Sequence, residues 1–167
     1  MLSILFLIVP LFGFSQIKEI KLRSKFMGAD SVVLVSHDDT QGVAIVDSLG
    51  NNIPLPKLII GAKPNYAIIK ERKVLNSKQI DTLIRILARP FSDKRIETYK
   101  CYMPHHSIFI FKNGKISFID LCFWCHGFET SSDLNKFFYA FDNQKWEELE
   151  SFFKQFEFKY KLDSFEE

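Results

Sequence analysis

The amino-acid sequence predicts an α+β fold, in which an antiparallel β-sheet is packed by two or three helices. Three observations support this prediction. The first half of the chain has short β-branched runs between polar turns, a clear hairpin lies near residue 114, and apolar residues at helical spacing flank that hairpin. No repeat, low-complexity run or long linker divides the chain, so we expect one domain over residues 16–167.

The first fifteen residues are typical of a signal peptide. Leu2 to Leu11 is almost wholly apolar, and small residues precede a plausible cleavage point between Ser15 and Gln16. This stretch is shorter than the roughly 17 to 25 apolar residues that a spanning helix needs. We therefore expect an exported protein, periplasmic or secreted, without stable membrane insertion after cleavage of residues 1–15.

The composition narrows the class of partner. The net charge is only +2 among 167 residues, which does not favour nucleic acid, and export argues against it independently. Three cysteines in an oxidising compartment suggest one disulfide with a thiol left over, or a metal that uses more than two of them. The sequence identifies no partner, substrate or oligomeric state.

The predicted elements follow in chain order. Residues 31–36, 42–46, 58–60 and 66–69 are short apolar runs typical of strands. A helix is expected next, because Ile80, Leu83, Ile84 and Leu87 share one face. Asn76 with Gln79 resembles a capping box, and Pro90 ends the helix.

A hairpin and two further helices complete the prediction. Asn113-Gly114 between two apolar runs favours a type I′ turn, which needs positive φ at both central residues. Two helical stripes follow, separated by Asp142-Asn143, which can cap a new helix. They are Leu134, Phe137, Phe138 and Phe141, then Trp146, Leu149, Phe152, Phe153 and Phe156.

The three cysteines and three of the four histidines lie between residues 101 and 126. With a two-residue turn at Asn113-Gly114, Ser107 faces Asp120, His105 faces Cys122, and Cys101 approximately faces His126. Opposed side chains on one face lie about 4.5 to 5.5 Å apart at Cβ. The register therefore predicts that four of these residues gather on one side of the sheet: His105, Cys122, Cys101 and His126. Cys125 joins them only if the chain turns at Phe123-Trp124.

His106 is set aside, because neighbours on a strand point to opposite faces. The remaining candidates for a disulfide or a metal site are Cys101, Cys122, Cys125, His105 and His126.

Four interpretations compete for this Cys/His corner. The first is a structural disulfide from Cys101 to Cys122 or Cys125, which would stabilise the fold by roughly 3 kcal/mol. The second is a zinc-type site, since Cys122 and Cys125 with Cys101 and one histidine make a Cys3His set.

The third interpretation is thiol-disulfide redox work by Cys122 and Cys125, although a helix N-terminus that would activate such a pair is not predicted there. The fourth is c-type haem attachment, because Cys122 to His126 matches Cys-x-x-Cys-His. Haem ranks last, since its setting beside a short apolar strand offers no predicted pocket.

The same residues carry a resemblance. Cys101 to His106, followed by the Asn-Gly hairpin and by Leu121 to Cys125, resembles a set of small exported bacterial proteins of uncharacterised function. That set has a Cys-x-x-Pro and Cys-Phe-x-Cys pattern across a similar hairpin, and the resemblance covers roughly residues 95 to 131. It implies no activity.

Other candidate chemistry is sparse. His37 to Asp39 is read as a polar turn, and Ser107 opposite Asp120 as a cross-strand hydrogen bond without a histidine placed between them. We therefore expect a non-catalytic structural or binding module whose corner is closed by a disulfide or a metal. A thiol-redox protein using Cys122 and Cys125 is the alternative.

Overall fold

Five antiparallel strands form the centre of the molecule in this computed structural model, which describes residues 13–41, 45–90 and 102–162. Their order across the sheet is β6-β1-β7-β8-β9, and neighbouring strands run antiparallel throughout. The strands are β6 (Ile69–Val74), β1 (Ser31–His37), β7 (His106–Lys112), β8 (Lys115–Cys122) and β9 (Gly127–Thr130). The predicted α+β fold is therefore confirmed.

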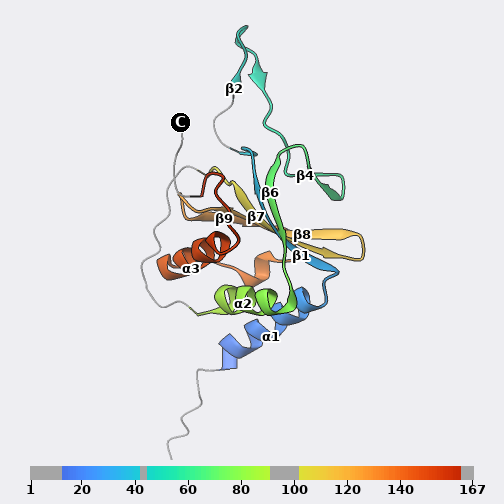
Figure 1. Cartoon of the computed structure of the whole chain (residues 1–167), viewed down its shortest axis with the longest axis vertical. Coiled ribbons are helices and arrows are strands. Elements are labelled where there is room, and N and C mark those ends of the chain that lie inside the picture. The colour runs from blue at the N-terminus through green and yellow to red at the C-terminus, as the bar shows by residue number, and fades with distance from the viewer. Residues whose placement is uncertain (1–12, 42–44, 91–101, 163–167) are drawn as a thin grey trace, which may run out of the picture.

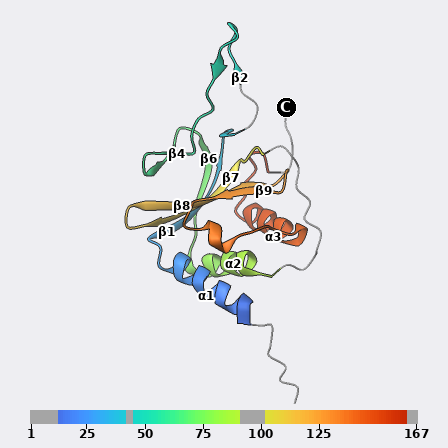
Figure 2. The same cartoon turned by 180° about the vertical axis from the view of Figure 1, so that it is seen from behind.

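One face of the sheet is covered by the helices of the described chain. They are α1 (Gly13–Met27), α2 (Ser77–Ala88) and α3 (Asn143–Lys154), and both views place them on the same side (Figures 1 and 2). Alternate strand residues such as Ile108 and Leu121 point into this layer and are fully buried. Most of the apolar core lies here, which leaves the other sheet face to a smaller cluster.

The opposite face is covered by the segment that joins β1 to β6. Val33, Val35 and Phe109 pack there against Leu58 and Ile68. The same segment contains two short hairpins, and the first projects away from the sheet in Figure 1. These hairpins are β2 (Ile45–Val46) with β3 (Asn52–Ile53), and β4 (Ile59–Ile60) with β5 (Lys63–Pro64).

The β7–β8 hairpin has the predicted register. Lys112 pairs with Lys115, and Ser107 pairs with Asp120. Asn113 and Gly114 have φ values of 51° and 72°, as a type I′ turn requires. The ladder continues only to His106, so His105 lies just before β7.

Two helix starts were also predicted correctly. Asn76 and Gln79 form a reciprocal capping box at the start of α2, and the Asp142 side chain caps α3 through the Lys145 N–H. Each cap satisfies an N–H group that has no partner within its helix. The second apolar stripe is confirmed as α3, whose buried face includes Trp146 and Phe153.

The predicted helix from Leu134 to Phe141 is wrong. Only Asn135–Phe137 are helical, as the short 3-10 turn η1, and Phe138 is already extended. Phe138 and Phe141 instead contact Phe128 of β9. Residues at this helical spacing therefore pack against β9 instead of lining one face of a helix.

Sequence patterns also missed or shifted several elements. Helix α1 was not predicted, because among its described side chains, those of residues 19–27, only Leu22 and Phe26 are buried in the core. Strand β6 begins at Ile69 rather than at residue 66, and most of it is charged and exposed. The short strands β3, β5 and β9 carry no apolar run from which they could be predicted.

Candidate functional site

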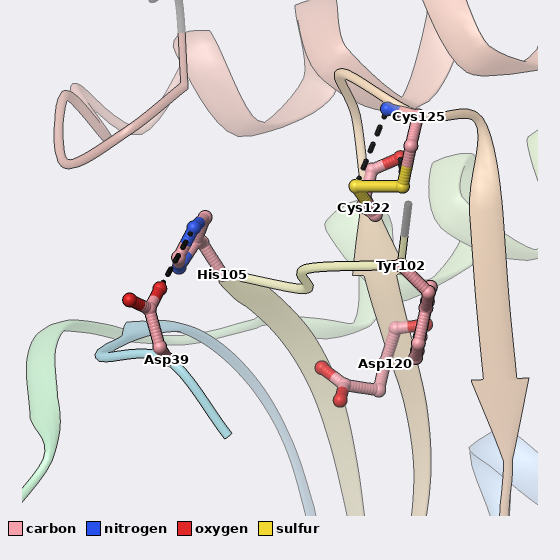
Figure 3. Close-up of a disulfide and its surroundings, with 6 residues drawn as sticks. All are labelled: Asp39, Tyr102, His105, Asp120, Cys122 and Cys125. Carbon is pink, nitrogen blue, oxygen red and sulfur yellow. Dashed lines mark hydrogen bonds and ion pairs between the residues drawn. A yellow bond between two sulfur atoms is a disulfide. The ribbon is translucent and has the colours of Figure 1, made fainter. Parts of the chain in front are cut away.

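A disulfide closes the turn between β8 and β9. Cys122 is the last residue of β8 and bonds to Cys125, with an S–S distance of 2.08 Å and a Cα–Cα distance of 5.4 Å (Figure 3). The chain turns at residues 123–126, and Cys122 then pairs with Gly127 at the start of β9. The predicted condition for bringing these two cysteines together, a bend at Phe123-Trp124, is therefore met.

The predicted link from Cys101 to Cys122 or Cys125 is wrong, because each of those two sulfurs is already bonded to the other. Cys101 itself lies outside the described residues. The structural-disulfide interpretation placed the bond across the hairpin ladder, and it left Cys122 with Cys125 to the redox and metal interpretations. The tight turn instead brings together two residues that are only three apart in the chain.

Two local features produce this turn. His126 has a φ of 49°, a left-handed conformation that is uncommon for residues other than glycine, and so it provides the reversal. Gly127 serves a different purpose, because a Cβ there would lie 3.0 Å from Cδ2 of Tyr102. The glycine allows the Tyr102 ring to pack close against the turn beside the disulfide.

The turn buries its sulfur atoms and exposes an indole. Cys122 and Cys125 are 4% and 1% exposed, whereas Trp124 is 57% exposed. The Cys125 N–H donates to the Cys122 Sγ at 3.2 Å. Phe123 points inward, where its ring contacts Trp146 and Phe153. The disulfide thus holds one aromatic side chain in the core and the next at the surface.

The histidines of the predicted corner do not gather around the sulfurs. Figure 3 shows His105 directed toward Asp39 and away from the disulfide, with Nε2 3.1 Å from the Asp39 Oδ1. Burial and the nearby Lys161 lower the pKa of His105, although Asp39 acts in the opposite direction. The prediction that His105 faces Cys122 is wrong, because the ladder ends at His106 and the chain departs before that pair.

His126 and His106 both lie among aromatic rings. His126 is stacked on Trp146, with ring centroids 5.4 Å apart and planes 6° apart. His106 is buried among Phe123, Phe153 and Phe158. Burial lowers the pKa of His106 to about 3, and the neighbouring His37 and His105 act in the same direction. His106 is thus neutral at ordinary pH.

Within residues 13–41, 45–90 and 102–162, no three His, Cys, Asp or Glu side chains form a group that could hold a metal ion. Haem attachment through thioether bonds would need both thiols of the Cys-x-x-Cys-His sequence. The Cys122–Cys125 disulfide uses the same two sulfurs, so the two arrangements exclude each other.

A buried polar cluster that the sequence did not reveal lies on the face opposite the helices. Nε2 of His37 is 3.0 Å from both the Ser107 Oγ and the Asp120 Oδ1, and the Ser107 hydroxyl donates to that same carboxylate oxygen at 2.7 Å. All three residues are at most 3% exposed. The Ser107–Asp120 hydrogen bond was predicted, but the participation of His37, the last residue of β1, was not.

This cluster contains the residue types of a hydrolase triad in a different arrangement. In such a triad the serine and the carboxylate contact opposite nitrogens of the histidine. Here both contact Nε2, while Nδ1 of His37 hydrogen-bonds the backbone oxygen of Asp38 at 2.8 Å. The cluster is also fully buried, so its geometry suits an internal polar contact between strands rather than attack on a substrate.

Further polar contacts lie nearer the surface, at Asp38 and Asp39, which follow His37 in the chain. The Tyr160 hydroxyl donates to Asp38 at 2.6 Å, and Lys161 lies 3.2 Å from Asp39. Burial and the hydrogen bond with Asp38 raise the pKa of Tyr160. The Glu71 carboxylate accepts the Lys159 and Tyr160 N–H groups, and these contacts attach residues 159–161 to the edge strand β6.

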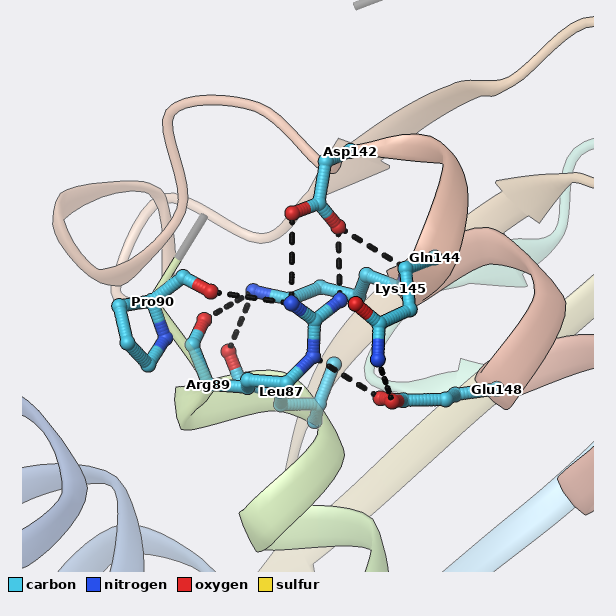
Figure 4. A network of polar contacts seen from close by, with 7 residues as sticks. All are labelled: Leu87, Arg89, Pro90, Asp142, Gln144, Lys145 and Glu148. Carbon is cyan, nitrogen blue, oxygen red and sulfur yellow. Dashed lines mark hydrogen bonds and ion pairs between the residues drawn. The ribbon is translucent and has the colours of Figure 1, made fainter. Parts of the chain in front are cut away.

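A third network joins α2 to α3. Arg89 donates to both carboxylate oxygens of Asp142 at 2.7 and 3.3 Å, and to Glu148 at 3.1 Å (Figure 4). Lys145 is only 1% exposed, and its ammonium donates to the backbone oxygens of Leu87 and Arg89. A cation is favourable at the C-terminal end of a helix, so Lys145 caps α2 from inside α3.

Comparisons of the chain with protein-family models, with curated proteins and with solved structures find no match. Among the helices of the described residues, none combines the length and the apolar character needed to cross a membrane.

Proposed function

We propose that this protein is an exported, non-catalytic binding module whose turn between β8 and β9 is closed by the Cys122–Cys125 disulfide. One observation carries the proposal: the two cysteines are buried while Trp124 between them is 57% exposed. A buried disulfide stabilises a turn and presents side chains in a fixed position, but a partner thiolate cannot easily reach its sulfur atoms.

Two further observations support the proposal. Disulfides persist in oxidising compartments, so the Cys122–Cys125 bond is consistent with the export expected from the apolar N-terminal segment. The residue types that could catalyse hydrolysis, Ser107 with His37 and Asp120, are buried and engaged with one another.

Thiol counting and zinc analysis on one sample test the state of the corner. We expect one reactive thiol in the denatured, unreduced protein and no stoichiometric zinc. The matched control is the Cys122→Ser/Cys125→Ser variant, which should give the same single thiol. Three thiols together with one equivalent of zinc would establish the zinc-type site and contradict the disulfide.

A thiol-redox protein is the second candidate, and one hydrogen bond favours it. The Cys125 N–H that reaches the Cys122 Sγ would also stabilise a thiolate at Cys122 after reduction. An insulin-reduction assay with dithiothreitol separates the two functions. The binding module should not accelerate insulin precipitation, and its disulfide should have a reduction potential below about −300 mV. Rapid turnover that is lost in Cys122→Ser would instead establish the redox function.

A further inference from the structure

The segment that joins β1 to β6 contains a long run without acidic residues. Residues 48–70 contain three lysines and no aspartate or glutamate, in a chain that has 20 acidic residues among 167. The same run contains four large apolar side chains that are exposed to solvent: Leu49, Ile53, Ile60 and Tyr66. Basic and apolar groups therefore share this surface, and no carboxylate of the run offsets their charge.

Two hairpins present this run at the surface. Both views place α1 and α2 at one end of the molecule and the β2–β3 and β4–β5 hairpins at the other (Figures 1 and 2). Leu58 and Ile68 attach the β4–β5 hairpin to the sheet through contacts with β1 and β7. The Asn65 N–H donates to the Leu58 oxygen at 2.9 Å and closes the hairpin. Ile60 and Tyr66 are 59% and 61% exposed, so they lie on the outer side of an anchored element.

The lysines of the β4–β5 hairpin are not neutralised by carboxylates. Lys57 and Lys63 are exposed, and neither forms an ion pair with the described residues. Lys70 differs, because its ammonium lies 2.8 Å from a carboxylate oxygen of Asp38. Asp47 precedes the run, and its carboxylate accepts hydrogen bonds within its own turn. The outer side of the β4–β5 hairpin is thus positively charged.

We propose that the β4–β5 hairpin with the adjoining Tyr66 binds the surface of an anionic phospholipid membrane, reversibly and without crossing it. In this arrangement Lys57 and Lys63 meet the phosphate headgroups, and Ile60 and Tyr66 enter the layer just below them. Lysine and tyrosine both have an apolar body and a polar tip, which suits this depth. The inference uses the proposed export, which brings the protein to a membrane surface, and it does not depend on the disulfide turn.

A bilayer fits these hairpins better than a folded acidic protein does. A folded partner buries a protruding apolar side chain only where it has a matching pocket, since packing in the centre of an interface is as dense as in a protein interior. The β2–β3 hairpin is a second protrusion, with Leu49 in its turn and Ile53 on β3. A fluid surface accepts two protrusions at any spacing, whereas a folded protein needs two pockets at a matched distance.

Vesicle sedimentation of the disulfide-intact protein tests the proposal. Vesicles of phosphatidylcholine alone are compared with vesicles made of equal parts of phosphatidylcholine and phosphatidylglycerol. We expect the protein to bind the mixed vesicles at low ionic strength about tenfold or more tightly than the neutral ones. Added salt should weaken this binding, because it screens the lysine charges. Equal binding to both kinds of vesicle, or binding to neither, would overturn the proposal.

Charge reversal on the hairpin tests the electrostatic part. Lys57→Glu/Lys63→Glu should weaken binding to the mixed vesicles by about tenfold or more. The matched control is Lys78→Glu/Lys136→Glu, since these lysines are also exposed, lie on α2 and η1, and give a variant of the same net charge. Similar losses in both variants would assign the binding to the net charge of the whole protein and overturn the proposal.

Removal of the apolar side chains tests the second part. Ile60→Ser/Tyr66→Ser should weaken binding about tenfold, because binding at the interface also scales with the apolar area that is buried. Ile20→Ser/Tyr139→Ser removes the same two residue types from positions that are 66% and 93% exposed elsewhere, and it should leave binding unchanged. Equal effects of the two variants would place the membrane contact elsewhere and overturn the proposal. Circular dichroism verifies that all four variants are folded.

Competition with a soluble polyanion separates a lipid from an acidic protein as the occupant. Poly-glutamate, at the same concentration of negative charge, should leave most of the protein on the mixed vesicles. Displacement of most of the protein would indicate an acidic protein partner and overturn the proposal. If vesicle binding fails while the disulfide is inert in the insulin assay, only this inference is lost. Rapid insulin reduction would instead remove the proposed non-catalytic function.

Discussion

Nε2 of His37 lies 3.0 Å from Oδ1 of Asp120 in the interior of the protein, although 83 residues separate the two in the chain. The contact joins the end of β1 to β8 across the intervening strand β7, which contributes Ser107 to the same carboxylate. Three central strands are thereby fixed in register at one point by polar groups, since a slip would leave these groups buried and unsatisfied.

Removal of the shared acceptor should be costly. Asp120→Ala leaves His37 and Ser107 buried without their carboxylate partner, and we expect a loss of about 2 to 4 kcal/mol in the free energy of unfolding. Urea denaturation followed by circular dichroism measures this loss. Glu129→Ala, on the exposed residue that pairs with Asp120 in β9, is the control and should change the value by less than about 0.5 kcal/mol.

The disulfide should stabilise the folded protein by a modest amount. Its loop is short, so the chain-entropy model gives a loss of about 2 kcal/mol for the Cys122→Ser/Cys125→Ser variant. Cys101→Ser should be nearly silent, because Cys101 takes no part in this bond. Thermal unfolding of both variants measures the difference. Comparable losses in Cys101→Ser and Cys122→Ser would instead indicate the cross-hairpin disulfide that the sequence suggested.

His106 should make the protein less stable in mild acid. Its pKa in the folded protein is about 3, below the roughly 6.5 of an unfolded histidine, so the unfolded chain binds the extra proton between these values. The free energy of unfolding is therefore highest above pH 6.5, and it falls as the pH drops toward 3. The slope from this one group is at most about 1.4 kcal/mol per pH unit.

Urea denaturation at pH 7.0, 6.0 and 5.0 measures the slope. His106→Phe retains the aromatic contacts with Phe123 and Phe153 and removes the titrating group, so its profile should be flatter over this interval. An unchanged slope in His106→Phe would assign the acid sensitivity to other groups, of which His105 is the first candidate, because its pKa is also lowered.

Asp142 should be the residue most sensitive to substitution at the α2–α3 contact. It is 0% exposed, caps α3 and receives two hydrogen bonds from Arg89. Asp142→Ala leaves Arg89 without this charge and removes the cap, with an expected loss of about 3 to 5 kcal/mol. Glu148→Gln alters only a partly exposed contact of the same arginine and should cost less than about 1 kcal/mol. Urea denaturation of the two variants gives both values.

Local patterns predicted the hairpin and two helix starts because their causes lie within a few residues. Asn113-Gly114 requires a particular backbone conformation, and Asn76 with Gln79 satisfies the first N–H groups of α2. The α+β class follows from these same periodicities. By contrast, residues 134–141 have a helical spacing but do not form the predicted helix, because Phe138 and Phe141 contact Phe128 instead. No local sequence pattern indicates a contact between residues that lie on different elements.

The candidate site was predicted only in part, for a related reason. Cys122 and Cys125 were recognised, but their partnership depends on a turn that begins where the ladder ends and on the left-handed conformation of His126. His37 was read as part of a surface turn because nothing local indicates that β1 pairs with β7. That pairing places His37 beside Ser107, and it is a property of the assembled sheet.

The position of the disulfide also limits how far the open edge of the sheet extends. The closed turn ends at His126, so β9 begins at Gly127 and is only four residues long, ending at Thr130. Segments that build cross-β fibrils typically span six or seven residues, so a strand of this length falls short of one. The sulfur–sulfur bond, by holding the reversal at residues 123–126, thus keeps the last strand of the sheet short as well as its turn closed.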